Sequence, residues 1–349
     1  MRQLILLLLG LSVSCAYAKA GGDDDKSAPL FADNEIVEVT ITAPFDEIMS
    51  SRSLDDELQG TLVYRDAASG QDVTLNIGIR ARGKFRRQKD ICTFAPLRLN
   101  FRKTKDTLFA KSDKMKLVTH CRQRSSAYEQ AVVKEYIAYR ILNTLTDWSF
   151  RARLLKARYV ESTSGEEIAD TYAVLIEHDK QLAKRIGMKV DDSESTTVAA
   201  LDARHTNLVS VFQYLIGNTD FSPIKGVPGD SCCHNYVLLK SDDQQISVPY
   251  DFDVTGLVAP PHAAPNPRFR LNSVRERLYR GRCANNEHLE ATLQQFRDQR
   301  QAIESLVIDQ PALSKRERKR TLRYIDDFYK TVDSPRRVND RLLEACLKS

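Results

Sequence analysis

Residues 217–256 read GNTDFSPIKGVPGDSCCHNYVLLKSDDQQISVPYDFDVTG, and this stretch decides how the rest of the chain is interpreted. Asp220 lies in a turn after a helical pattern, Asn235 begins one predicted strand, and Asp251 and Asp253 follow the next strand. Phosphoryl transfer uses such a set, because a carboxylate orients the attacking hydroxyl while Asn and Asp oxygens hold the magnesium ions that bridge nucleotide phosphates. The stretch therefore predicts a phosphate-transfer site.

The first twenty residues have the pattern of a signal peptide. Arg2 precedes an apolar run at residues 4–13. Small residues suited to signal-peptidase cleavage follow at Ala16, Ala18 and Ala20. About ten apolar residues are too few for a transmembrane anchor, which needs roughly 20. We therefore expect an exported protein, periplasmic or secreted, with no transmembrane segment after cleavage. Cys15 leaves a lipoprotein open as an alternative, which Ser12 disfavours because a lipobox usually has an aliphatic residue there.

Composition and charge narrow the class of protein. The chain has 349 residues, of which 42% are hydrophobic, and residues 21–34 are polar and acidic, which predicts a flexible linker. The net charge of +5 is modest, but basic residues cluster at 80–89 and 315–320. The first cluster is suited to phosphates or an anionic envelope polymer, and the second is interpreted as a solvated helix face. No aromatic residues alternate with the second cluster, so nucleic acid is not an expected partner.

Six cysteines follow the predicted cleavage site, at Cys92, Cys121, Cys232, Cys233, Cys283 and Cys346. An even number in an exported protein predicts up to three disulfides, whose pairing the sequence does not fix. We expect the neighbours Cys232 and Cys233 to have different partners, because a bridge between adjacent residues is strained. Zinc is the rival interpretation, but there is no Cys-x-x-Cys pair and His234 is the only nearby imidazole.

Hydrophobic periodicity predicts an α+β fold. Strand patterns occur at 35–43, 61–65, 73–80, 96–101, 114–119, 155–161 and 171–177. Helical spacing occurs at residues 126–145 and 201–216, a hairpin is predicted over 237–249, and the chain beyond Asn286 is typical of two or three helices. We expect a β-rich amino-terminal lobe at 35–180, with an antiparallel sheet and one long helix, and a mainly helical lobe at 181–349.

Several strings in this order resemble the CotH spore-coat kinase-like family. They are IGIRARGKF at 77–85, APLRLNF at 95–101, YAVLIEHDKQLAKRIG at 172–187, and then GNTD, HNYVLL and PYDFD. GNTD is also similar to the HipA-like kinases. The resemblance covers roughly residues 37–256 and implies a bilobal protein-kinase-like fold.

The resemblance also implies roles for the acidic residues. Asp220 would orient or deprotonate the acceptor hydroxyl, although an aspartate that caps a turn is the structural alternative. Asn235 and Asp251 would hold Mg or Mn, with Asp253 as a second candidate. Asp251 and Asp253 would point the same way if extended backbone continued past Tyr250. A solvated strand end is a poor alternative for these two, because their neighbours are apolar.

Candidates for gripping the phosphates of ATP come from the amino-terminal part. Lys116 lies in an apolar strand and needs an ion-pair partner, for which we expect Glu129 or Glu135. Arg98, in the preceding strand, is a rival for the same role. Gly83 lies in a turn whose backbone amides could approach phosphate oxygens, although a plain hairpin turn is the alternative.

The chain departs from ordinary kinases in two respects. Residues 221–234 separate Asp220 from Asn235, whereas about four residues do so in kinases, and there is no G-x-G-x-x-G loop. The main hypothesis is an exported CotH-like enzyme that transfers phosphate from ATP, with Mg or Mn, to a hydroxyl of a protein or envelope polymer. The alternatives are an inactive, disulfide-stabilised binding or scaffold protein of the envelope, and a protein that binds an anionic polymer through residues 80–89.

Overall fold

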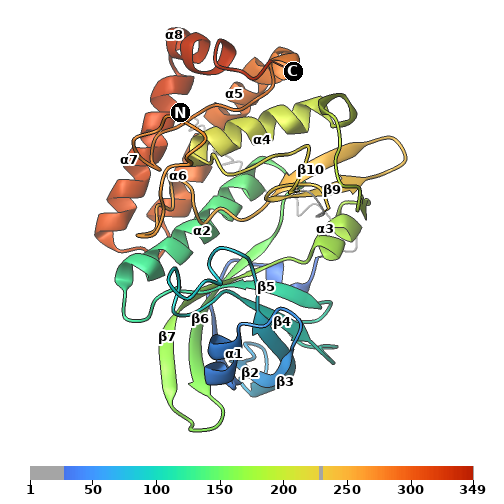
Figure 1. Ribbon diagram of the computed structural model, residues 1–349, viewed down its shortest axis with the longest axis vertical. Coiled ribbons are helices and arrows are strands. Elements are labelled where there is room, and N and C mark those ends of the chain that lie inside the picture. The colour runs from blue at the N-terminus through green and yellow to red at the C-terminus, as the bar shows by residue number, and fades with distance from the viewer. Residues whose placement is uncertain (1–26, 228–230, 349) are drawn as a thin grey trace, which may run out of the picture.

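The computed structural model describes residues 27–227 and 231–348, so the predicted signal peptide lies outside the described residues. Seven strands form a closed barrel in the order β1-β2-β3-β4-β5-β7-β6 (Figure 1). They are β1 (Val37–Ala43), β2 (Leu58–Arg65), β3 (Asp72–Ala81), β4 (Leu97–Phe101), β5 (Lys114–Val118), β6 (Ala152–Glu161) and β7 (Glu167–Ile176).

The barrel closes through its first strand. β1 pairs antiparallel with β2 along one edge and parallel with β6 along the other, in a register that runs from Val37 opposite Leu155 to Ala43 opposite Glu161. Alternate residues of β1 are buried, as the two-residue period of a strand requires. Their side chains fill the barrel interior together with those of the facing strands, so the barrel has its own hydrophobic core.

This architecture corrects the expected fold. The chain is α+β, but the bilobal protein-kinase-like fold with an antiparallel sheet is wrong, because the strands form a closed, mixed barrel. The predicted strands themselves are confirmed within a few residues. Alternation and turn residues are local signals, whereas the parallel pairing of β1 with β6 joins distant segments that no turn connects.

The helix α2 (Ser126–Leu145) lies between the barrel and the other helices. It contacts β6 and β7 on one side and α6 on the other (Figure 1). The remaining helices are α1 (Phe45–Ser51), α3 (Asp179–Arg185), α4 (Ala203–Ile216), α5 (Leu289–Asp298), α6 (Arg300–Ile308), α7 (Lys315–Val332) and α8 (Pro335–Val338). Four of them follow Asn286, one more than the largest number expected.

A small second sheet packs among these helices. It has the order β10-β9-β8, formed by β8 (Lys189–Val190), β9 (Tyr236–Lys240) and β10 (Gln245–Pro249). The predicted hairpin is thus confirmed. Its apolar residues join α2, α4 and α7 in a second hydrophobic core, separate from that of the barrel.

The described part of the expected linker packs against the barrel. Residues Pro29–Phe31 form a 3₁₀ helix, and Leu30 is fully buried in the barrel core. None of the helices within residues 27–227 and 231–348 is long and apolar enough to cross a membrane.

The structure pairs the cysteines as Cys92–Cys121, Cys232–Cys233 and Cys283–Cys346. Disulfides are thus present, but the expectation that Cys232 and Cys233 have different partners is wrong. The Cys283–Cys346 bridge ties the segment before α5 to the carboxyl-terminal residues, where Arg282 also pairs with Leu347.

Candidate functional site

The hairpin brings Asn235 and Asp251 to one edge of the small sheet. Pro249 pairs with Tyr236, and the Tyr250 amide donates to the Asn235 carbonyl over 3.0 Å. Asn235 precedes β9 and Asp251 follows β10, so antiparallel pairing places both beside the same hairpin end. Both have left-handed backbone, with φ of 57° and 64°. Such conformations are uncommon outside glycine and persist where the surrounding structure holds them.

Asp220 joins this pair despite the intervening loop. It follows α4, which ends at Gly217 in a left-handed C-cap, and its amide donates to Asn218 Oδ1 over 2.9 Å. Asn235 Nδ2 donates to the Asp220 carbonyl over 2.7 Å. Asp220 and Asn235 are therefore in contact, although fourteen residues lie between them in the sequence.

His234 completes this end of the site. Its Nε2 lies 2.9 Å from Asp220 Oδ1. The hydrogen bond with Asp220 raises the pKa of His234, and the same bond lowers the pKa of the Asp220 carboxyl. In the sequence this histidine was considered only as a zinc ligand, and the one signal that pointed to the site was its position beside Asn235.

Asp251 lies at the centre of the site. Its amide donates to the Tyr139 hydroxyl over 2.9 Å, whereas its carboxylate forms no hydrogen bond or ion pair with the residues that the structure describes. Its negative charge partly opposes the lowering of the Lys116 pKa by burial, and it adds to larger causes that raise the pKa values of Glu135 and His234. The residues around it therefore come from the barrel, from α2 and from the loop before β9.

Carboxylates outnumber cations on one side of Asp251. Glu135, on α2, is only 2% exposed, and burial, then Asp253 and Asp251, raise its pKa well above the usual range. Burial, reinforced by Asp251, raises the pKa of Asp253 to about 7, although Arg86 opposes the shift. Arg86 Nη1 lies 3.4 Å from Asp253 Oδ2. The three carboxyls therefore resist ionising together in the absence of a further cation.

Asp251 and Asp253 lie near each other because of a backbone conformation that the sequence did not predict. Extended backbone does not continue past Tyr250, because Asp251 is left-handed and Asp253 lies in a turn. The turn keeps both carboxyls near α2, which the coupling of Asp253 with Asp251 and of both with Glu135 requires.

Lys116 lies at the opposite side of Asp251, in β5. Its Nζ is 3.1 Å from Asp179 Oδ1 and 3.9 Å from the centre of the Tyr250 ring, and its side chain is 23% exposed. Burial lowers the pKa of Lys116, although Asp179 opposes the shift. The expected partners are wrong: Asp179 replaces them, and Glu129 instead lies 3.9 Å from Lys156.

The other two phosphate-binding candidates differ in position. Arg98 is the cross-strand neighbour of Lys116, and its charge lowers the pKa of Asp179 after the larger effect of Lys116. Arg98 thus belongs to this side of the site. Gly83 has a φ of +82° and open space where a Cβ would lie, with no contact to the acidic residues. A plain turn accounts for that glycine.

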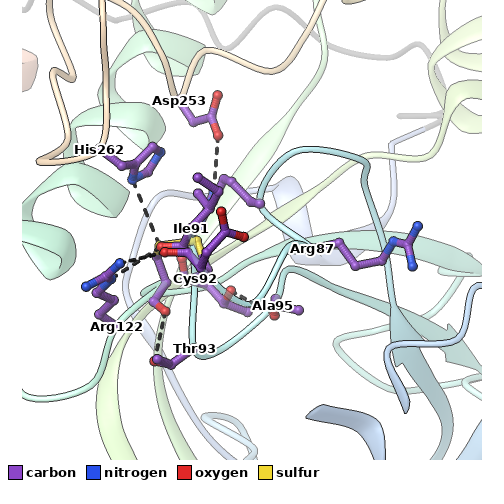
Figure 2. The surroundings of a disulfide bond; sticks show 12 residues. Arg87, Ile91, Cys92, Thr93, Ala95, Arg122, Asp253 and His262 are labelled. Carbon is purple, nitrogen blue, oxygen red and sulfur yellow. Dashed lines mark hydrogen bonds and ion pairs between the residues drawn. A yellow bond between two sulfur atoms is a disulfide. The ribbon is translucent and has the colours of Figure 1, made fainter. Parts of the chain in front are cut away.

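The Cys92–Cys121 disulfide secures the segment that carries Arg86. Figure 2 shows Asp253 and His262 approaching the surroundings of this bridge while Arg87 points away from them. His262 Nδ1 lies 3.9 Å from Cys121 Sγ. Arg86 Nη2 donates to the Thr119 carbonyl over 2.6 Å, two residues before Cys121. One side chain of the basic cluster at 80–89 therefore reaches the acidic site.

A metal held by protein side chains alone is not apparent. Within residues 27–227 and 231–348, no group of three or more His, Cys, Asp and Glu side chains is arranged to hold a metal ion. Mg²⁺ in nucleotide sites usually takes one or two carboxylates together with substrate phosphates and water. Asp251, whose carboxylate has no partner among the described residues, fits that smaller requirement together with Asp253 and the amide oxygen of Asn235.

Comparison with models of known protein families and with curated proteins finds no match for this chain. The resemblance to the CotH family therefore stays a prediction from the sequence, and the site has to be judged by its own geometry.

Proposed function

We propose that the chain is a metal-dependent phosphotransferase that moves the terminal phosphate of ATP to a hydroxyl of a protein or envelope polymer. The observation that carries the proposal is the Asp251 carboxylate, which has no partner among the described residues and lies among a cation, a histidine and two further carboxyls. The cystines Cys92–Cys121 and Cys283–Cys346 favour an oxidising compartment, which supports an exported protein.

Asn235, Asp251 and Asp253 would hold Mg²⁺ or Mn²⁺, and the ion would neutralise charge on the phosphate oxygens. Glu135 is only 2% exposed and its raised pKa favours the neutral form, so a cation that binds beside it would favour its ionisation. Asp253 changes protonation near neutral pH in the protein alone, so a cation would displace its proton.

Lys116 would bind the phosphates from the other side of Asp251. Its Nζ is partly exposed and held by Asp179 and the Tyr250 ring, so its position is fixed before the nucleotide arrives. Fixed positive charge near a transferring phosphoryl group lowers the barrier without reorganisation during the reaction.

The Asp220–His234 pair would handle the proton of the acceptor hydroxyl. Both side chains are about half exposed, at 50% and 41%, so an acceptor has access to them. Asp220 orients the imidazole through Nε2, and His234 in its neutral form takes the proton through the other ring nitrogen.

The first experiment measures binding and transfer separately. Purified protein is incubated with γ-labelled ATP and Mn²⁺, with casein as a protein acceptor and dextran as a polymer acceptor, and its melting temperature is recorded with and without the nucleotide. We expect a rise in melting temperature that requires the metal, and label on an acceptor or on the protein itself. A nucleotide-dependent rise without transfer would support an inactive binding protein instead, and no rise at all would remove nucleotide chemistry from consideration.

A further inference from the structure

An open pocket with a volume of about 410 Å³ lies on α7, outside the acidic site. Its lining residues are Arg275, Arg320, Arg323, Tyr324 and Asp327. Four of them follow the spacing i, i+3, i+4 and i+7 along α7, so they share one face of the helix. Arg275 comes from the irregular segment between β10 and α5. We call this the arginine pocket.

The arginine pocket has more positive charge than its surroundings neutralise. Arg320 pairs with Glu317 over 2.9 Å, and Glu317 is shared with the buried Lys134 at 3.1 Å. Arg275 donates only a long bond of 3.4 Å to the Gly256 carbonyl. Arg323 forms no hydrogen bond or ion pair with the residues that the structure describes.

The acidic residue of the pocket is already occupied. Asp327 lies 2.8 Å from Lys330, on the same helix. Glu317 is likewise divided between two cations. Neither carboxylate is therefore available to balance Arg275 and Arg323, and an anion from solution would do so.

The ring of a buried tyrosine forms part of the pocket lining. Tyr324 is 7% exposed, and its hydroxyl has no hydrogen-bond partner among the described residues. The hydroxyl packs against Gly217 and Gly256, where a Cβ on either glycine would collide with it. Arg277 stacks on the ring at 3.7 Å and keeps the side chain in place.

We propose that the arginine pocket binds a phosphomonoester of a small polyol, either free or at the end of a larger molecule. Guanidinium groups match phosphate oxygens with two parallel hydrogen bonds each. The pocket is within the range of small-molecule sites and has room for more than a phosphate group. Asp327 Oδ2, the carboxylate oxygen that is not paired with Lys330, then accepts hydrogen bonds from hydroxyls of the polyol.

The arginine pocket is separate from the acidic site that would bind nucleotide, although residues of α2 lie near both. Neighbouring residues of α2 face in different directions, since Lys134 pairs with Glu317 while Glu135 couples to Asp253. Gly217 and Gly256, which Tyr324 contacts, lie at the two ends of the stretch that carries the acidic residues. The proposal does not depend on phosphotransfer.

The test is calorimetric titration of the purified protein with glycerol 3-phosphate, with glycerol as the uncharged control and inorganic phosphate as the minimal anion. We expect glycerol 3-phosphate to bind more tightly than phosphate, glycerol not to bind, and affinity to fall with added salt. Arg323→Ala and Arg320→Ala should each weaken binding at least 10-fold. Arg316→Ala, an exposed arginine of the same helix outside the pocket, should leave it unchanged.

Two further variants locate the site. Tyr324→Phe should leave binding within about 2-fold of the unmodified protein, because the hydroxyl lies against Gly217 and Gly256 and not in the open pocket. Asp251→Asn should leave glycerol 3-phosphate binding intact. No binding by the unmodified protein, or equal binding by the Arg323→Ala and Arg316→Ala variants, would overturn the proposal. Loss of binding in Asp251→Asn alone would place the phosphomonoester in the acidic site and overturn it as well. A second titration, with dextran 6-phosphate, distinguishes a polymer-borne phosphate from the free ester.

Discussion

The two ends of the acidic site differ in how their charges are balanced. At one end Asp220, His234 and Asn235 form a hydrogen-bonded unit, in which the carboxylate has both a ring nitrogen and an amide as partners. At the other end Asp253 pairs with Arg86, whereas Glu135 and Asp251 form no ion pair with the residues that the structure describes. The first end is complete in the protein alone, whereas the second gains stability when a further cation arrives. We infer that orientation belongs to the first end and metal binding to the second.

The largest expected effect comes from removing the central carboxylate. Asp251→Asn keeps the size of the side chain but removes the charge that has no partner among the described residues. We expect transfer to fall at least about 100-fold, and the metal-dependent rise in melting temperature with ATP to disappear. Labelled transfer and thermal melting measure the two effects. Transfer and metal dependence equal to those of the unmodified protein would assign the metal to other residues.

The second prediction tests the balanced end through pH. Asp220 raises the pKa of His234, and His234 accepts a proton only when neutral, so transfer should increase as pH rises through that raised pKa. His234→Gln should lower the rate about 100-fold and remove this dependence. Asp220→Asn withdraws the hydrogen bond that raises the pKa of His234, so the increase should move to lower pH. An unchanged pH profile in His234→Gln would exclude the histidine as the proton acceptor.

The third prediction concerns the effect of the buried Glu135 on the stability of the folded protein. Burial and the two aspartates raise the pKa of Glu135 above its unfolded value, so the folded state loses stability as pH rises from about 4 and the unfolded chain ionises. Glu135→Gln should therefore raise the free energy of unfolding by about 1–3 kcal/mol at pH 8 and leave it unchanged near pH 4. Denaturant titrations at the two pH values measure this change.

Glu129→Gln is the matched control for that measurement. Glu129 lies six residues earlier on α2 but is partly exposed, and its Oε1 lies 3.9 Å from Lys156 Nζ. Its effect should stay within about 0.5 kcal/mol at every pH. A stability gain for Glu135→Gln that does not vary with pH would indicate repacking rather than relief of charge.

The sequence predicted the positions of the strands and of the hairpin better than it predicted how they are arranged in space. Strands and the hairpin follow from alternation and turn residues, so their positions are correct within a few residues. The closed barrel was missed because Val37 and Leu155 pair across the fold with no local signal. Likewise, Lys116 was expected to pair with α2, but its partner Asp179 comes from the start of α3, which only the fold brings near.

The acidic residues show the same division. Asp220, Asn235 and Asp251 were identified from residue type and order, and the hairpin register explains why they meet. Their functional roles stay predictions. Arg86 and His234 were not assigned to the site, because their contacts depend on a disulfide-bonded segment and on a loop whose path the sequence does not determine.

The seam between β1 and β6 also constrains when the barrel can form. Residue 37 is synthesised long before residue 155, so one edge of β1 has no native partner until β6 has been made. Four strands and a long helix are made in between. Such distant pairing slows folding, and an open edge invites pairing with other chains. The barrel is therefore expected to be the slowest part of the molecule to fold. Until β1 pairs with β6, we expect the open edge of β1 to be the part of the barrel that a chaperone for unfolded chains binds.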